Sequence, residues 1–78
     1  IKWIKGVREY CKIFMTNSNL LITKKLSAIQ QLLPDGQFVR IHKSYIVNMN
    51  YVTIRKGNSL FVDGERMPIG RDYKNNLK

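Results

Sequence analysis

The feature that most constrains the fold of this sequence is a series of short runs in which apolar and polar residues alternate, each run being interrupted by turn-forming residues. Between positions 10 and 16, the apolar residues Cys11, Ile13 and Met15 stand at every second position, and the same period recurs between positions 52 and 69. A period of two places alternate side chains on one face, which is typical of a half-buried β-strand. The sequence therefore predicts a mainly β fold of small antiparallel sheets with two short helices.

The expected strands stand before and after the segment from 45 to 50. After position 51 the pattern predicts a three-stranded meander, which turns at Gly57-Asn58 and at Gly64. The segment from 45 to 50 is ambiguous, and its structure stays open. The strands expected before it are Ile1–Lys5, Tyr10–Thr16, Leu20–Thr23 and Phe38–Ile41.

One segment between these strands has a helical period instead. Leu26, Ile29 and Leu33 stand at i, i+3 and i+7 and form an apolar stripe. We expect Thr23 to be the N-cap of this helix and Pro34 to end it.

The second helix is expected at residues 71–77. Its Tyr73 and Leu77, at i and i+4, can dock on the sheet. The opposite stripe contains only cationic residues: Arg71, Lys74 and Lys78.

Size and charge limit the functions that this chain can have. Its 78 residues form one domain, residues 1–78, whose thin core excludes a two-domain enzyme with a cleft between the domains. The chain has 14 Lys and Arg against 5 Asp and Glu, which gives a formal charge of +9. This imbalance predicts an anionic partner.

The residue types needed for catalysis or metal binding are sparse and scattered. His42 and Cys11 are each the single residue of their type, and the five acids are separated along the chain. Three or four convergent ligands are needed for a metal site, and a nucleophile needs a base held by a third group. We therefore expect no enzyme activity, no metal and no cofactor. One cysteine and the absence of an apolar run of about 18 residues predict a reduced, cytoplasmic protein without a membrane partner.

Three places offer cations on rigid supports. Lys43 and Ser44 stand in a turn directly after a strand, and Arg8 and Tyr10 stand in the first hairpin region. Arg71 begins the terminal helix, where its charge opposes the helix dipole and where Gly70 leaves backbone N–H groups open. This combination predicts a phosphate or guanine partner.

The segment from Phe38 to Asn48, FVRIHKSYIVN, closely resembles the hallmark of the LytTR family of DNA-binding domains, F-x-R-x-H-[RK]-S-[YF]-[IL]-V-N. The opening Ile1–Tyr10, the helix end Leu32-Leu33-Pro34 and the closing run from Met67 to Tyr73 are also similar to that family, so the resemblance covers nearly the whole chain. It departs from the family pattern at Gly70, where the family usually has Ser.

The resemblance implies an elongated arrangement of small sheets that inserts loops into successive major grooves of double-stranded DNA. It implies that bases are contacted by Lys43, Arg71, Arg8 and Tyr10. Contacts to the DNA backbone are expected from Ser44, Lys12, Lys74 and Lys56. His42 and Asn48, which flank the His-Lys-Ser turn, are expected to hold it by hydrogen bonds.

The family's domains are common output modules of bacterial response regulators in two-component systems. We therefore expect this chain to be the C-terminal part of a longer transcriptional regulator, with a first strand of the domain upstream of Ile1. Two copies are expected to bind repeated half-sites as a dimer formed through the upstream module. The alternative is that the LytTR-like fold serves as a basic interaction module for an acidic protein or a membrane surface.

Overall fold

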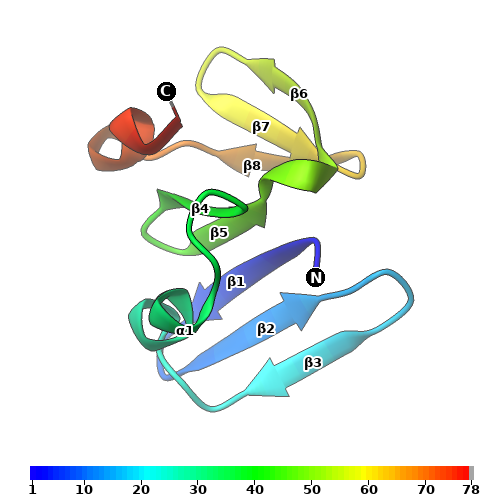
Figure 1. Cartoon of the computed structure of the whole chain (residues 1–78), viewed down its shortest axis with the longest axis vertical. Coiled ribbons are helices and arrows are strands. Elements are labelled where there is room, and N and C mark those ends of the chain that lie inside the picture. The colour runs from blue at the N-terminus through cyan, green and yellow to red at the C-terminus, as the bar shows by residue number, and fades with distance from the viewer. Residues whose placement is uncertain (78) are drawn as a thin grey trace.

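Two small antiparallel sheets make up most of the protein, as the computed structural model of residues 1–77 shows (Figure 1). The mainly β fold predicted from the alternating pattern is confirmed. The principal extents are 32, 28 and 21 Å, so the arrangement is only moderately elongated. The five-stranded sheet has the order β3-β2-β1-β5-β4 and is formed by β1 (Trp3–Val7), β2 (Tyr10–Phe14), β3 (Asn19–Ile22), β4 (Phe38–His42) and β5 (Tyr45–Asn48). The three-stranded sheet is the predicted meander, β6 (Val52–Lys56), β7 (Ser59–Val62) and β8 (Glu65–Pro68).

The first helix, α1 (Leu26–Leu32), lies where the helical period predicted it, but its cap differs. The N-cap is Lys25, which has an extended backbone and makes no side-chain capping hydrogen bond. The expectation that Thr23 caps the helix is therefore wrong, because the chain bends at Thr23 and Lys24 and the helix begins only at Leu26. The helix ends before Pro34, and Leu33 is extended as a residue preceding proline should be.

The terminal helix, η2 (Arg71–Leu77), is a 3₁₀ helix and not an α-helix. In a 3₁₀ helix, residues three apart are eclipsed, so Arg71 and Lys74 share an edge. Tyr73 is half-buried and Leu77 packs against the core, as the sequence predicted. Lys78, the third cation of the predicted stripe, lies outside the described residues.

The ambiguous segment from 45 to 50 contains the strand β5 followed by a short 3₁₀ helix, η1 (Met49–Tyr51). The change occurs at Asn48, whose side-chain oxygen accepts a hydrogen bond of 3.0 Å from the Asn50 N–H. This interaction caps η1 and ends the strand.

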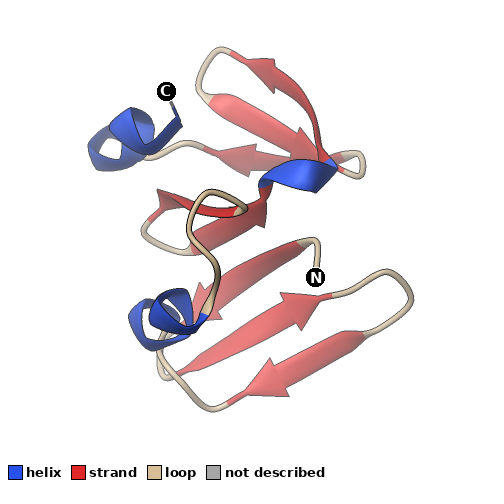
Figure 2. Ribbon diagram, viewed as in Figure 1, coloured by secondary structure: helices blue, strands red, loops and turns tan. Residues whose placement is uncertain are grey.

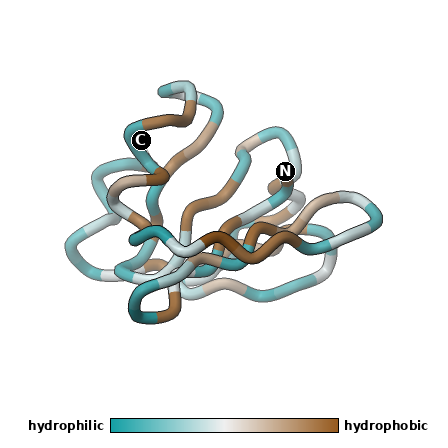
Figure 3. The backbone as a smooth tube through the Cα atoms, turned by 90° about the horizontal axis from the view of Figure 1, so that it is seen from below, coloured by the Kyte–Doolittle hydropathy of each residue, from teal (hydrophilic) through white to brown (hydrophobic). Residues whose placement is uncertain are grey.

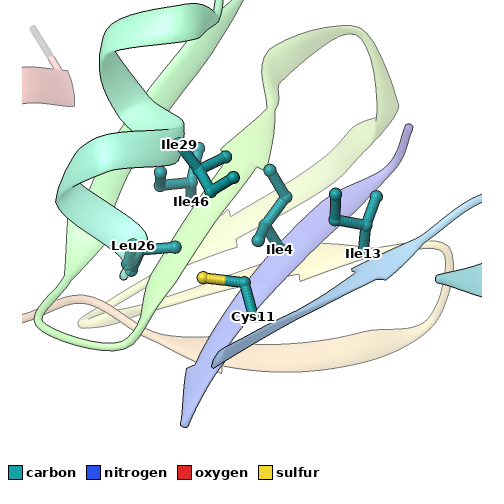
Figure 4. Packing of buried hydrophobic residues seen from close by; sticks show 6 residues of the cluster. All are labelled: Ile4, Cys11, Ile13, Leu26, Ile29 and Ile46. Atoms are coloured by element: carbon teal, nitrogen blue, oxygen red, sulfur yellow. The ribbon is translucent and has the colours of Figure 1, made fainter. Parts of the chain in front are cut away.

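The adjacent strands β1 and β5 contribute side chains to cores on both faces of the sheet. On one face, Ile4 and Ile46 pack against α1, where the first core is formed by Ile4, Cys11, Ile13, Leu26, Ile29 and Ile46 (Figure 4). On the other face, the second sheet covers a core of Ile41, Val47, Leu60, Val62, Met67 and Ile69. Apolar segments thus run along the strands while the turns are hydrophilic (Figure 3), and the turns are left free for binding.

Gly6 determines how closely α1 approaches β1. A Cβ atom at this position would lie 3.1 Å from Cβ of Leu26 and 3.3 Å from its Cδ2. These distances are tighter than ordinary van der Waals contact, so a side chain at residue 6 would require Leu26 to shift by a few tenths of an ångström.

We predict that Gly6→Ala lowers the free energy of unfolding by about 1 to 3 kcal/mol, because the added methyl group overpacks the contact with Leu26. Urea denaturation measures this change. Lys5→Ala, at the neighbouring exposed position of β1, is the control and should change stability by less than about 0.5 kcal/mol. A Gly6→Ala protein as stable as the Lys5→Ala protein would show that this contact does not limit the approach of α1.

Candidate nucleic-acid interface

Three segments that are far apart in the sequence meet at one end of the sheets. The Gly6 N–H of β1 donates a 2.8 Å hydrogen bond to the Ser44 carbonyl, which joins the β1–β2 turn to the β4–β5 turn. The Gly70 N–H donates a 2.7 Å hydrogen bond to the Ile41 carbonyl, which attaches the start of η2 to the same turn. Figure 2 shows α1 and η2 at this end, on the left of the view, with the β4–β5 turn between them.

The β4–β5 turn is held by side chains from within the HKS motif and just before it. Nδ1 of His42 accepts a 3.0 Å hydrogen bond from the Ser44 N–H. The Arg40 guanidinium donates through Nε to the His42 carbonyl at 3.2 Å and through Nη2 to the Lys43 carbonyl at 2.6 Å. With both ends of the turn fixed to protein partners, the Lys43 side chain projects from a rigid support and is exposed.

Arg40 also connects this turn to both helices. Its Nη1 donates to Oε1 of Gln30 in α1 at 3.3 Å, and its guanidinium carbon lies 5.5 Å from the ring centroid of Tyr73 in η2. Nδ2 of Asn76 donates a 2.9 Å hydrogen bond to the Arg40 carbonyl. The half-buried Arg40 thus positions the turn, α1 and η2 relative to one another.

A recess of about 280 Å³ lies between the β1–β2 turn, the start of α1 and the β4–β5 turn. Four cationic side chains line it, and no acidic residue of the described chain belongs to its lining. The lining consists of Gly6, Arg8, Lys25, Leu26, Ser27, Arg40, Lys43 and Ser44. The structure therefore brings the predicted residues Arg8, Lys43 and Ser44 together, and it adds Lys25 and Ser27 to them.

Arg8 occupies a strained position in the two-residue β1–β2 turn. Val7 pairs with Tyr10 across the turn, and Arg8 has a φ of 56°, which is uncommon for a residue other than glycine. Glycine or asparagine would fit this conformation at lower cost. An arginine at this position therefore holds a backbone conformation that costs energy. Tyr10 follows the turn and is 37% exposed.

Gly70 lets the chain pass closely over the β4–β5 turn before η2 begins. A Cβ atom at this position would lie 3.0 Å from Cδ2 of Tyr73 and 3.5 Å from Cα of His42. The Gly70 N–H itself is not open, because it donates to the Ile41 carbonyl, and the Tyr73 N–H donates to the Gly70 carbonyl at 3.0 Å. The exposed Arg71 side chain is thus the group at this position that could meet an anion.

Asn48 does not support the β4–β5 turn, and this expectation is corrected. It lies at the opposite end of β5, where its Nδ2 donates a 2.8 Å hydrogen bond to the Ile1 carbonyl and its Oδ1 caps η1. Sequence proximity suggested the role, but three residues of extended strand, from Tyr45 to Val47, separate Asn48 from the turn. Arg40 performs the expected function instead.

The remaining predicted cations lie away from the recess. Lys12 points to the sheet face opposite α1, since its neighbours Cys11 and Ile13 face the first core, and its Nζ lies 5.3 Å from the Phe14 ring centroid. Lys56 ends β6 and Lys74 lies in η2, and both are exposed. Their contacts with DNA stay a prediction.

Sequence reasoning gave no role to Arg40, Lys25 or Ser27. Arg40 is part of the F-x-R-x-H motif, so a signal was present, although nothing in the motif indicates which carbonyls the guanidinium contacts. Lys25 and Ser27 carry no signal of their own, because only the packing of α1 on β1 brings them to the two turns.

The single cysteine is a core residue. Its Sγ donates to the Lys24 carbonyl at 3.1 Å, and burial raises the pKa of the Cys11 thiol, against a smaller opposing effect of the Arg40 charge. Within residues 1–77, no helix is long and apolar enough to cross a membrane. That same part of the chain contains no group of three or more His, Cys, Asp or Glu residues placed to hold a metal ion.

Comparison with known proteins gives a consistent result. The family model of the LytTr DNA-binding domain matches residues 1–78. The sensory transduction protein LytT of Bacillus subtilis (strain 168) is 32% identical over 63 residues, which cover 73% of this chain and 26% of that protein. LytT of Bacillus anthracis is 31% identical over 81 aligned positions, covering 96% of this chain and 29% of that protein. The chain thus spans less than a third of the length of these relatives.

A solved LytTr DNA-binding domain from Bacillus cereus has the same fold. It superimposes with a TM-score of 0.86 over 99% of this chain and 76% of that chain, at 23% sequence identity. The small sheets and their connections are therefore shared at low identity.

We predict that Arg40→Lys lowers the free energy of unfolding by about 1 to 3 kcal/mol, because a lysine keeps the charge but cannot donate to His42, Lys43 and Gln30 at once. Urea denaturation measures the stability, and hydrogen exchange at the Ser44 amide reports whether the turn opens. Arg66→Lys, at an arginine whose Nε donates to Ser59 Oγ outside the recess, is the matched control. Unchanged stability and unchanged Ser44 protection in Arg40→Lys would contradict the role of this side chain.

Proposed function

The chain belongs to the LytTR family of DNA-binding domains, and from this premise we propose that it binds double-stranded DNA with sequence specificity, as the output domain of a bacterial response regulator. In this proposal the loops at one end of the sheets enter successive major grooves. No recognition helix lies in a groove, and η2 contributes only its first residue, Arg71, to base readout.

The observation that carries the proposal is the meeting of three cation-bearing segments at one end of the molecule. The β1–β2 turn presents Arg8, the β4–β5 turn presents Lys43, and the start of η2 presents Arg71. Hydrogen bonds of 2.7 to 2.8 Å tie these segments to one another, so their side chains keep a fixed spacing. A fixed spacing is what recognition of a regular ligand such as a duplex requires.

The residue types suit base readout in the major groove. Lysine can donate to O6 and N7 of guanine, and arginine can donate to both in a bidentate fashion. We assign base contacts to Lys43 and Arg71 first, and to Arg8 and Tyr10 in the hairpin. Contacts to the phosphates, which set the position on the duplex, are assigned to Ser44, Lys12, Lys56 and Lys74.

The longer protein is expected to place two such domains on repeated half-sites. The relatives are more than three times as long as the matched segment, so they hold further parts that could bring two copies together. A single domain with a longest extent of 32 Å reaches about one helical turn of DNA, which favours two copies over one.

We predict that Lys43→Ala and Lys74→Ala change DNA binding in different ways. Lys43→Ala should weaken binding to the preferred duplex by about 1 to 3 kcal/mol and relax discrimination at one base pair, because it removes a base contact. Lys74→Ala should weaken preferred and scrambled duplexes alike and lower the slope of log K against log salt concentration by about 1, because it removes a phosphate contact.

Titrations at two salt concentrations measure both effects, with a preferred duplex first selected from a random library by the unmodified protein. Failure of the selection to enrich any sequence would contradict sequence-specific binding. It would leave the acidic-partner alternative in place. Equal effects of the two variants on both duplexes would contradict the assignment of Lys43.

We predict that Arg71→Gln leaves the free energy of unfolding within about 0.5 kcal/mol of the wild type, because the side chain is exposed. The same change should weaken binding to the preferred duplex. Arg71→Lys should restore binding to scrambled DNA better than base discrimination, since an ammonium group cannot form the bidentate pair. Thermal melts and duplex titrations of the three proteins decide this. An Arg71→Gln protein that is destabilised yet binds the preferred duplex normally would show that Arg71 is structural.

A further inference from the structure

The recess beside Lys43 has the charge of an anion-binding site. Its lining holds the side chains of Arg8, Lys25, Arg40 and Lys43 together with the hydroxyl groups of Ser27 and Ser44, and it holds no acid. Like charges gathered in this way repel one another and disfavour the empty recess. A bound anion would attract all of these cations and so offset their mutual repulsion.

The four cations are not equally available to a ligand. Three N–H groups of Arg40 donate to Gln30, His42 and Lys43, so this guanidinium contributes charge more than free donors. By contrast, no hydrogen bond or ion pair within residues 1–77 engages the side chains of Arg8, Lys25 or Lys43. Arg8, Lys25 and Ser27 are also exposed, so an incoming ligand can reach them.

The position of the recess identifies the anion. Lys43 belongs both to the recess and to the tip of the β4–β5 turn, so an anion in the recess would lie beside the groove that this turn is proposed to enter. In a DNA duplex, the groups that border each groove are backbone phosphates, which carry a negative charge and accept hydrogen bonds from cations and hydroxyls. We propose that Lys25 and Ser27 at the start of α1, with Arg8 opposite them, bind one backbone phosphate of the duplex and thereby fix how Lys43 enters the adjacent groove.

This inference rests on the proposed function and adds to it a role for α1. The start of α1 is held against β1 by the close contact of Leu26 with Gly6 and by the burial of Leu26 and Ile29. A phosphate bound by Lys25 and Ser27 is therefore positioned relative to the sheet, and through the sheet relative to Lys43. The specificity of Lys43 then depends on a helix that contacts no base.

The test is a thermodynamic cycle between the protein and single positions of the DNA backbone. A set of preferred duplexes, each with one neutral methylphosphonate, is titrated with the wild type, with Lys25→Gln and with Ser27→Ala. A methylphosphonate at one position should weaken wild-type binding about tenfold. At the same position it should have little effect on Lys25→Gln, because this variant lacks the ammonium group that pairs with the phosphate charge. Lys25→Gln should also lower the slope of log K against log salt concentration by about 1.

Lys24→Gln is the matched control. Lys24 is the preceding residue, has the same charge and exposure, and does not line the recess. The methylphosphonate that has little effect on Lys25→Gln should weaken the binding of Lys24→Gln as much as it weakens the binding of the wild type. Ser27→Ala should reduce that effect in part and should not lower the melting temperature, since alanine is the better helix former.

The outcomes separate the two proposals. If the wild type prefers one duplex but Lys25→Gln and Lys24→Gln respond alike at every backbone position, the phosphate site is overturned and DNA recognition stands. If the wild type shows no preference among duplexes, the proposed function fails first.

Discussion

The arrangement of the candidate interface depends on the contacts of one side chain, the Arg40 guanidinium. From the middle of β4 it donates to two carbonyls of the β4–β5 turn, to Gln30 of α1, and lies over the ring of Tyr73 in η2. A planar group with several donors in fixed directions can join three segments at once, which an ammonium group on a flexible stem cannot do. The turn that presents Lys43 and the helix that begins with Arg71 are therefore parts of one unit.

That unit is supported by two strands that contribute side chains to both cores. Ile4 of β1 and Ile46 of β5 face α1, while Val47 of β5 and the half-buried Trp3 of β1 pack in the second core. A chain of this size has little interior, and sharing two strands between two small cores lets each core bury more apolar surface than it could alone. These strands hold the turns at their ends in place, and a binding loop needs such a fixed position.

The distribution of charge explains why turns and helix ends, and not the body of a helix, are the candidates for base contact. α1 contains no cationic residue between Leu26 and Leu32, and its Leu26 and Ile29 side chains are buried in the core. η2 is a short 3₁₀ helix that carries Arg71 and Lys74 together with Asp72 in its first turn. The other cations around the recess are found in the turns and at the start of α1, as with Arg8, Lys43 and Lys25.

The sequence by itself determined the elements and the family. Alternation of Cys11 and Ile13 predicted β2, the spacing of Leu26 and Ile29 predicted α1, and the FVRIHKSYIVN run identified the family, because such patterns depend on neighbours a few residues apart. Only the tertiary structure decided that Asn48 caps η1, that Arg40 holds the turn, and that Lys25 and Ser27 join Arg8 and Lys43 around one recess. The cations that line the recess come from segments up to 35 positions apart, from Arg8 to Lys43. What brings them together is the packing of α1 on β1 and the pairing of β1 with β5, and no local pattern records which side chains such packing makes neighbours.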